Sequence, residues 1–453
     1  MTTAPSIERA PVSVTISRRA DAVTLLSWYV LLLMVVPAWL VLGPLGAAGG
    51  PSTVFAALLC AWYLMAWLHP AFAPEKGRQP VRLAALGFAC SILATYVSVN
   101  RIGMSTLEEN GADRGIIFMA GWVGVLLFTA DGIETLDRFR ALLRRIVMAA
   151  SFMSAIAITQ FFAGINIANY VVIPGLVNQL ADHTILLDRG GLNRPSATAL
   201  DPIELAAVLA MCLPLAIHQA RHAAPEVRLR RWLQVALIGA TLPLTVSRTV
   251  VLAFAVICLV LLPTWPKRDR RFAYVAIAVA VVAVWVTKPS LAQTFRSLFL
   301  GISSDSSTAS RTSAFSSAGQ FIAQHPWLGH GFGTFFPQTF FFTDDQYLLT
   351  LIETGVIGLL ALVVLFVTAL STARRARRLA VDPEIRDLAQ CLAASVAAGA
   401  VAFATLDAFS FPVVSGLTFL LIGCVGAVWR LAQQREASHS TDLGMLAVRD
   451  TGL

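Results

Sequence analysis

The chain of 453 residues is short of charge. Asp, Glu, Lys and Arg make up 13% of it, whereas 57% is hydrophobic and the mean hydropathy is +0.72. So few charges exclude a soluble globular protein. The apolar runs, roughly 15 to 25 residues long, match the ~30 Å hydrocarbon core of a bilayer. Because backbone groups must pair internally in lipid, these runs must be helices. We therefore predict an all-α, polytopic membrane protein.

Cysteine is also scarce and unpatterned. All six cysteines fall inside predicted spans, without a disulfide framework or the spacing of metal ligands, so we interpret them as small apolar packing residues. They are Cys60, Cys90, Cys212, Cys258, Cys391 and Cys424. The chain also lacks a convincing internal repeat. Neither a metal nor a cofactor is expected.

About 12 transmembrane helices are predicted. They cover residues 23–43, 52–69, 82–98, 115–130, 146–164, 203–220, 232–246, 249–264, 272–288, 346–370, 388–406 and 412–430. Basic residues favour the cytoplasmic side of a membrane, and 26 of the 34 Lys and Arg fall in the connections that share a side with both termini. Both termini are therefore predicted to be cytoplasmic, in the inner membrane. These basic loops facing anionic lipid account for the net charge of +8 without a nucleic-acid partner.

The predicted organisation is one transmembrane domain, residues 23–432, between two cytoplasmic tails. The tails, residues 1–22 and 433–453, are polar and are expected to lack regular structure.

Two outer loops interrupt the apolar pattern. The first covers residues 165–202, and the larger one covers residues 289–345, between the ninth and tenth helices. In the larger loop, apolar residues at three- and four-residue spacing predict amphipathic helices around residues 291–299 and 315–322 that lie on the outer leaflet. A long loop with helices of its own is usually functional.

Three outer arginines, Arg194, Arg248 and Arg311, run against the charge bias of the topology. A guanidinium is permanently charged and grips phosphate oxygens in a bidentate manner. Three arginines on the same outer face indicate that their side chains converge on one anion, such as a pyrophosphate. The alternative is interface anchoring, or an ion pair with Asp201, Asp305 or Asp344.

Carboxylates gather where the large loop meets the tenth predicted helix. Asp344 and Asp345 precede this helix, and Glu353 lies about 12 Å further along it. Asp344 is a candidate general base, whereas helix N-capping is the alternative for both aspartates, above all for Asp345. An acid at the depth of Glu353 needs a cavity or a partner, and a structural arginine partner is the alternative to a role in the site.

The run His325-Pro326-Trp327-Leu328-Gly329-His330-Gly331-Phe332-Gly333 is the most distinctive motif of the large loop. Its glycines have a phosphate-loop spacing, but no strand precedes them and no lysine follows. A tight turn at the membrane surface is the favoured interpretation. The two histidines lack a third ligand for zinc.

Together with Gln346-Tyr347-Leu348 and Glu353-Thr354-Gly355, this run resembles the signature of the O-antigen ligase/polymerase family. Ser247-Arg248-Thr249 is similar to the Ser-Arg element of that family, and Arg194-Pro195 with Asp201-Pro202 resembles its first outer-loop element. The motifs cover residues 190–360.

The resemblance implies a metal-independent membrane glycosyltransferase of cell-envelope polysaccharide biosynthesis. Such enzymes move a glycan from a polyprenyl diphosphate to an acceptor hydroxyl on the outer face of the membrane. The implied catalytic residues are Asp344 and Arg311, and the implied substrate-binding residues are Arg194, Arg248, Asp201, Tyr347 and Glu353. The implied partners are the lipid-linked oligosaccharide, the glycan acceptor, membrane lipids and other polysaccharide-assembly proteins.

One departure from the family concerns the acceptor. Ligases of the family carry a His-Asn pair where this chain has Asp344-Asp345, three and two residues before Tyr347. The departure favours a polymerase, or a ligase with another acceptor. If a base is needed, Asp344 takes that position.

A secondary transporter or flippase of a glycan-lipid or small anion is the alternative. Transporters place charges or broken helices near the bilayer midplane, whereas the polar residues here gather in outer loops. A transporter predicts a polar path through the membrane, and an enzyme predicts a cavity that opens to the outer side and the lipid.

Overall fold

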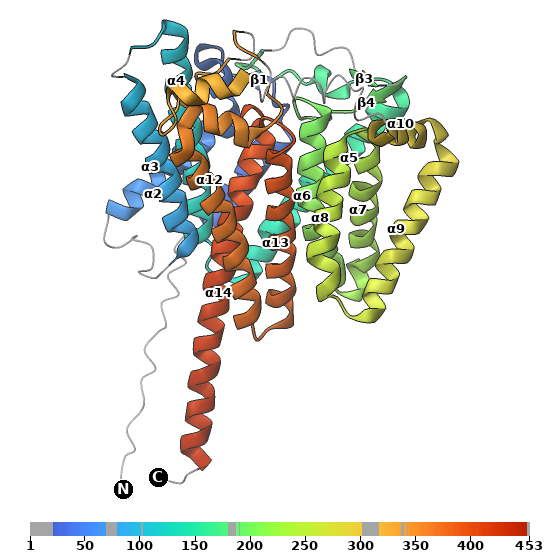
Figure 1. Cartoon of the computed structure of the whole chain (residues 1–453). Helices are drawn as coiled ribbons and strands as arrows, with labels where there is room; N and C mark the ends of the chain where they lie inside the picture. Colours follow the sequence, from blue (N-terminus) through green and yellow to red (C-terminus); the bar gives the residue numbers. More distant parts are fainter. Residues whose placement is uncertain are drawn as a thin grey trace.

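The computed structural model describes residues 21–68, 79–100, 103–179, 187–189, 191–300, 317–336, 339–341 and 343–450. Most of these residues form long α-helices that run side by side (Figure 1). The helices are α1 (Ala22–Met34), α2 (Pro51–Leu68), α3 (Pro80–Asn100), α4 (Thr106–Gly132), α5 (Leu136–Ala163), α6 (Pro202–Arg221), α7 (Pro225–Leu244), α8 (Arg248–Leu261), α9 (Lys267–Thr287), α10 (Pro289–Leu300), α12 (Gln346–Leu379), α13 (Pro383–Phe403) and α14 (Pro412–Asp450). The all-α, polytopic fold class is confirmed.

Eight helices of the described part are long and apolar enough to cross a membrane: α2, α3, α4, α5, α6, α12, α13 and residues 412–436 of α14. Two further apolar helices are shorter, Ala22–Met34 and Arg248–Thr264. Helices α7 and α9 overlap predicted spans, but each begins with a cluster of basic residues. Each of the twelve predicted segments overlaps a helix, and the number of membrane crossings stays a prediction.

Several helix boundaries differ from the predicted ones, and two of them have a local cause in the sequence. The first predicted span, 23–43, is helical only to Met34, because Pro37 disfavours helical geometry in the residue before it. The expectation that residues 433–453 lack regular structure is wrong, since α14 continues to Asp450. The run Leu431-Ala432-Gln433-Gln434-Arg435-Glu436 consists of strong helix formers, which explains why the helix continues beyond residue 432.

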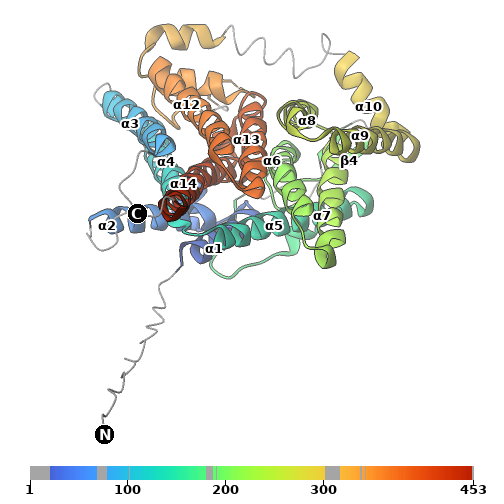
Figure 2. The same cartoon turned by 90° about the horizontal axis from the view of Figure 1, so that it is seen from below.

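The centre of the bundle is made by α6, α13 and α14. Their apolar windows are 83%, 78% and 89% buried within the protein, whereas that of α2 is 22% buried. Seen along the bundle, α6 and α13 lie next to each other (Figure 2). Helices buried on all sides hold their ends in fixed positions, so the ends of these helices are suited to carry a site.

Short elements cover the end of the bundle at which α6, α8 and α12 begin, which we call the loop end (Figure 1). Here β1 (Leu40–Val41) pairs antiparallel with β2 (Val177–Asn178), and β3 (Leu187–Arg189) forms a hairpin with β4 (Leu192–Arg194). The described residues also form the 3₁₀ turns η1 (Gly43–Gly49), η2 (Ile167–Tyr170), η3 (Leu262–Thr264) and η5 (Ala408–Ser410).

At the opposite end, α6 ends, α13 begins and the last part of α14 projects beyond the other helices. We call this the tail end. In the large loop, α10 matches the first predicted amphipathic helix, and residues 317–324 are helical where the second was expected. Arg311 and the serine-rich run 303–310 lie outside the described residues.

Candidate functional site at the loop end

Arg194 ends strand β4 and lies half-buried at the loop end. Its Nε donates to the carbonyl oxygen of Thr245, at 3.1 Å. Between Arg194 and α6, the buried Ala197 adopts a left-handed conformation with φ 52°, which is costly for a residue other than glycine. The amide of Gln160 holds this turn, because its Oε1 accepts from the N–H of Ala197 at 2.7 Å.

Arg248 is the first residue of α8, and a second strained turn precedes it. Val246 has φ 48° and is fully buried. A β-branched residue in the left-handed region is an outlier, and such strain gathers at functional sites. Ser247 caps α8, since its Oγ accepts from the N–H of Thr249 at 3.3 Å. A cation at a helix N-terminus opposes the helix dipole, so the position of Arg248 favours an anion close by.

The structure brings these two arginine segments together. The hydrogen bond from Arg194 reaches Thr245, three residues before Arg248. Beyond Arg248, the hydroxyl of Thr249 donates to the hydroxyl of Thr405 at the end of α13, at 2.9 Å. Two of the three arginines predicted to converge therefore belong to contacting segments, and Arg311 lies outside the described residues.

Three carboxylates lie at the same end of the bundle. Asp201 caps α6, where it accepts from the N–H of Ile203 at 2.7 Å. Asp407 lies between α13 and α14, where burial raises its pKa to about 6. The charges of Asp344 and Asp201 raise this pKa further, whereas a hydrogen bond with Ser410 lowers it. The three acids are thus close enough for their charges to interact.

The sequence analysis missed Asp407. The segment Thr405-Leu406-Asp407-Ala408-Phe409-Ser410 is the polar break between two predicted spans and contains a single carboxylate. The predicted topology places this break on the outer side, together with the other candidate residues. A lone carboxylate in an outer connection could therefore have marked Asp407 as a candidate residue. Only the packing of the helices shows that Asp407 lies near Asp201 and Asp344.

Helix α12 begins beside this acid. Asp345 caps it, because its Oδ1 accepts from the N–H groups of Tyr347 and Leu348 at 2.9 and 3.2 Å. The capping interpretation is therefore confirmed for Asp345. The next residue, Gln346, accepts from the N–H of Phe409 at 2.8 Å, which attaches the start of α12 to the connection that carries Asp407.

Tyr347, a predicted substrate-binding residue, is engaged within the bundle. Its hydroxyl donates to the carbonyl oxygen of Ala400 in α13 at 2.9 Å. Its ring lies against Phe366 and Phe403, with centroids 6.5 and 6.4 Å away. In this structure, Tyr347 joins α12 to α13, and its predicted contact with substrate stays a prediction.

Glu353 anchors the distinctive run of the large loop. Its side chain is 4% exposed, and its Oε1 accepts from the N–H groups of Gly333 and Phe335 at 3.1 and 3.3 Å. Its backbone carbonyl accepts from the N–H of Gly331 at 2.8 Å. Within the part of the chain that the structure describes, the partners of its carboxylate are therefore backbone groups of the loop.

The loop enters a break in α12. Gly355 has φ 64°, and a Cβ there would lie 2.3 Å from the carbonyl carbon of Trp327. The N–H of Val356 donates to the carbonyl oxygen of Pro326 at 2.9 Å. This packing favours the tight-turn interpretation of the glycine run. His330 belongs to the same unit, with Nε2 3.0 Å from the carbonyl oxygen of Phe321, and burial lowers its pKa.

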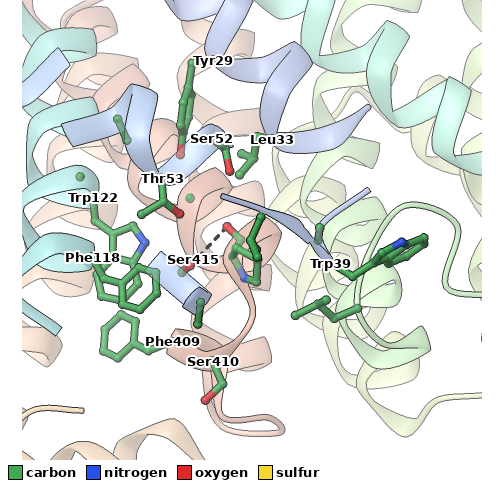
Figure 3. A pocket seen from close by; sticks show the side chains of 18 of the residues that line it. Tyr29, Leu33, Trp39, Ser52, Thr53, Phe118, Trp122, Phe409, Ser410 and Ser415 are labelled. Atoms are coloured by element: carbon green, nitrogen blue, oxygen red, sulfur yellow. Dashed lines mark hydrogen bonds between the residues drawn. The ribbon is translucent and has the colours of Figure 1, made fainter. Parts of the chain in front are cut away.

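A cavity of about 320 Å³ adjoins the connection that carries Asp407 (Figure 3). The rings of Phe118, Trp122 and Phe409 gather on one side of it, with Trp122 and Phe409 stacked at 4.5 Å between centroids. Its hydroxyl groups come from Tyr29, Ser52, Thr53, Ser410 and Ser415. Aromatic walls with a few placed polar groups are typical of ligand pockets.

Residues 233–363 match the family model described as O-Antigen ligase. The match contains Arg248, Asp344 and Glu353, and it ends before Asp407. No curated protein matches the chain. The matched segment contains the Ser-Arg turn, the large loop and the start of α12, which contribute to the loop-end site. The chain is a multi-pass membrane protein, and its residues 233–363 are similar to the O-antigen ligase family, an enzyme family.

Proposed function

We propose that this protein transfers a saccharide from a polyprenyl diphosphate to the hydroxyl of an acceptor sugar at the loop end, on the outer face of the cytoplasmic membrane. One observation carries the proposal. The strained turns before Arg248 and after Arg194 are hydrogen-bonded into one unit, next to three interacting carboxylates and a cavity. The cations suit the donor diphosphate, the acids suit the acceptor hydroxyl, and the aromatic pocket suits the sugar.

In this mechanism, Arg194 and Arg248 bind the diphosphate, and Arg311 is the expected third cation. Their charge stabilises the leaving group as the bond between the anomeric carbon and the phosphate oxygen breaks. The oxygen of the acceptor hydroxyl forms the new bond to the anomeric carbon. The diphosphate leaves as an anion, so the protein mainly orients the reactants and stabilises charge.

The acceptor proton goes to a carboxylate, either Asp344, as the sequence analysis expected, or Asp407. A pKa of about 6 for Asp407 leaves it mostly ionised at pH 7 and close to the value that suits a general base. Asp201 contributes negative charge nearby. The cavity beside Phe409 and Ser410 takes a saccharide unit.

The proposed topology has twelve spans with both termini in the cytoplasm. It places the tails 1–22 and 433–453 inside the cell, and it places residues 165–202 and 289–345 outside, within one glycosyltransferase domain over 23–432. A lipid-linked donor then reaches the site laterally from the outer leaflet. Other proteins of polysaccharide assembly are the expected partners.

The test uses purified full-length protein with polyprenyl-diphosphate oligosaccharides and no added metal. Longer lipid-linked products are expected for a polymerase, and transfer to a separate glycan acceptor is expected for a ligase. No product with either kind of acceptor would contradict the proposal. Uptake of the glycan-lipid into vesicles without formation of a new glycosidic bond would support the transporter alternative.

A further inference from the structure

Four side chains with metal-ligand chemistry meet at the tail end, far from the loop-end site. His218 and His222 lie one turn apart near the end of α6, and Asp387 and Cys391 lie one turn apart near the start of α13. Residues four apart share one face of a helix. Since α6 and α13 pack side by side (Figure 2), the two pairs face each other.

The other three groups converge on one oxygen of Asp387. Its Oδ2 lies 2.7 Å from Nδ1 of His218, 3.2 Å from Nε2 of His222 and 3.9 Å from Sγ of Cys391. The ligand atoms of His218, Asp387 and Cys391 all lie within 4.8 Å of one another. The two imidazole centroids are 4.8 Å apart.

Hydrogen bonds alone do not satisfy this arrangement well. A carboxylate oxygen offers about two lone pairs, whereas three potential donors converge on Oδ2. The other oxygen, Oδ1, already accepts from Arg221 at 2.6 Å, and Arg221 also pairs with Asp269 at 2.9 Å. Because Arg221 binds Oδ1, Oδ2 is the oxygen that faces the two histidines and the thiol.

We propose that these four residues form a structural zinc site, with His218 Nδ1, His222 Nε2, Asp387 Oδ2 and Cys391 Sγ as ligands. Zinc takes such nitrogen, sulfur and oxygen ligands in a tetrahedron, with ligand atoms roughly 3.3–3.6 Å apart. The observed separations from Oδ2 differ from that range by less than about 1 Å. Four protein ligands close the coordination sphere, which is the mark of a structural rather than a catalytic zinc ion.

The surroundings also suit an ion. Arg221 holds the outer oxygen of the ligating carboxylate, as groups around metal ligands commonly do. The side chain of His222 is 28% exposed while that of His218 is 3% exposed, so an ion enters from the His222 side. Binding releases the thiol proton of Cys391 and any proton shared with the imidazoles.

The bound ion would join two central helices. The opposite ends of α6 and α13 lie next to Asp201 and Asp407 at the loop end. A metal clamp at the tail end therefore stabilises the helices that position those acids. The proposal does not depend on glycan transfer, because its test measures metal binding and stability.

The experiment titrates purified full-length protein, first stripped with a chelator, with Co²⁺ and then with Zn²⁺. One equivalent of Co²⁺ is expected to give the absorption bands of four-coordinate cobalt and a thiolate charge-transfer band, and Zn²⁺ is expected to displace it. Cys391→Ser should lose the charge-transfer band. His222→Ala should weaken zinc binding at least about tenfold and abolish the rise in melting temperature that zinc gives the wild type.

Matched controls are Cys90→Ser, at an exposed position in α3, and His325→Ala, in the large loop. Both should bind one equivalent of zinc with unchanged affinity. Melting temperatures without metal show whether each variant is folded. Because His222 is partly exposed, His222→Ala is the variant least expected to unfold the protein. Failure of the wild type to bind one equivalent, or unchanged binding in Cys391→Ser and His222→Ala, would show that the cluster is only a hydrogen-bonded network and would overturn the proposal.

Discussion

The hydroxyl of Thr249 lies 2.9 Å from the hydroxyl of Thr405, and both side chains are buried. Thr249 follows Arg248 at the start of α8, and Thr405 precedes Asp407 by two residues. This contact joins the turn that carries a candidate phosphate-binding cation to the connection that carries a candidate base. Mutations can test the turn that carries Arg248 and the connection that carries Asp407 separately.

Arg248→Ala is expected to reduce glycan transfer by roughly 10²–10³-fold, because the diphosphate loses charge stabilisation. Arg248→Lys should restore little of the activity, since a point charge does not replace a planar fork of donors. The measurement is the rate of product formation by purified protein of equal melting temperature. Arg228→Ala, exposed at the tail end of α7, is the matched control and should transfer at the wild-type rate. Equal rates for Arg248→Ala and this control would remove Arg248 from the site.

Asp407→Asn is expected to raise the melting temperature at pH 8 and to change it less at pH 5. The folded-state pKa of about 6 lies above the ordinary value of 3.8, so the native protein carries the full cost of a buried charge above pH 6. At pH 5 the native carboxyl is mostly protonated but the unfolded one is still mostly ionised, so about half of that cost remains, and the rest is lost as the pH falls below the ordinary value of 3.8. An equal gain at both pH values would contradict the raised pKa.

If Asp407 is the base, kcat/KM should fall as the pH drops through about 6, because the carboxyl becomes protonated. Asp407→Asn should lose most of the activity, together with that acidic limb. Asp344→Asn is the comparison. Whichever variant keeps wild-type transfer is not the base, and a wild-type rate in both would exclude a carboxylate base at these positions.

Asp345→Ala is expected to destabilise the protein by roughly 0.5–2 kcal/mol, because α12 loses its N-cap. Its activity per folded molecule should stay close to that of the wild type. Thermal unfolding and transfer rates measured on the same samples distinguish this from a catalytic loss. A large loss of activity without a change in stability would assign Asp345 to the reaction.

Glu353→Gln is expected to keep most of the stability and activity, because an amide oxygen still accepts from the N–H groups of Gly333 and Phe335. Glu353→Ala leaves both donors buried without this acceptor, which should cost roughly 1.5–3 kcal/mol and reduce transfer. Melting temperatures and rates of the two variants provide the test. Complete inactivity of a fully stable Glu353→Gln would instead indicate that the negative charge acts on the substrate.

Much of the architecture was predictable from local patterns. Apolar runs between basic loops predicted the helices, and the spacing of apolar residues predicted α10 within the large loop. The ends of some helices were not predicted correctly. Pro37 lies just beyond the end of the first helix at Met34, and the helix-forming run from Leu431 to Glu436 carries α14 past residue 432.

The site was predictable only in pieces. Arg194 and Arg248 stood out because outer arginines run against the charge bias of the topology, and Asp344 because it lies where the large loop meets a predicted helix. Asp407 looked like an ordinary residue of a short connection. The capping role of Asp345 and the loop-anchoring role of Glu353 depend on hydrogen bonds that sequence spacing does not specify.

By itself, the sequence determined that this protein is a helical membrane protein, because the hydrophobic effect and backbone pairing in lipid act on local composition. It also contains, within residues 233–363, the motifs that make this segment similar to the O-antigen ligase family. Only the tertiary structure decided which distant groups meet. Thr249 reaches Thr405, and His218 reaches Asp387, because helix packing brings together residues more than a hundred positions apart. Such contacts depend on the geometry of the whole bundle, which no local pattern contains.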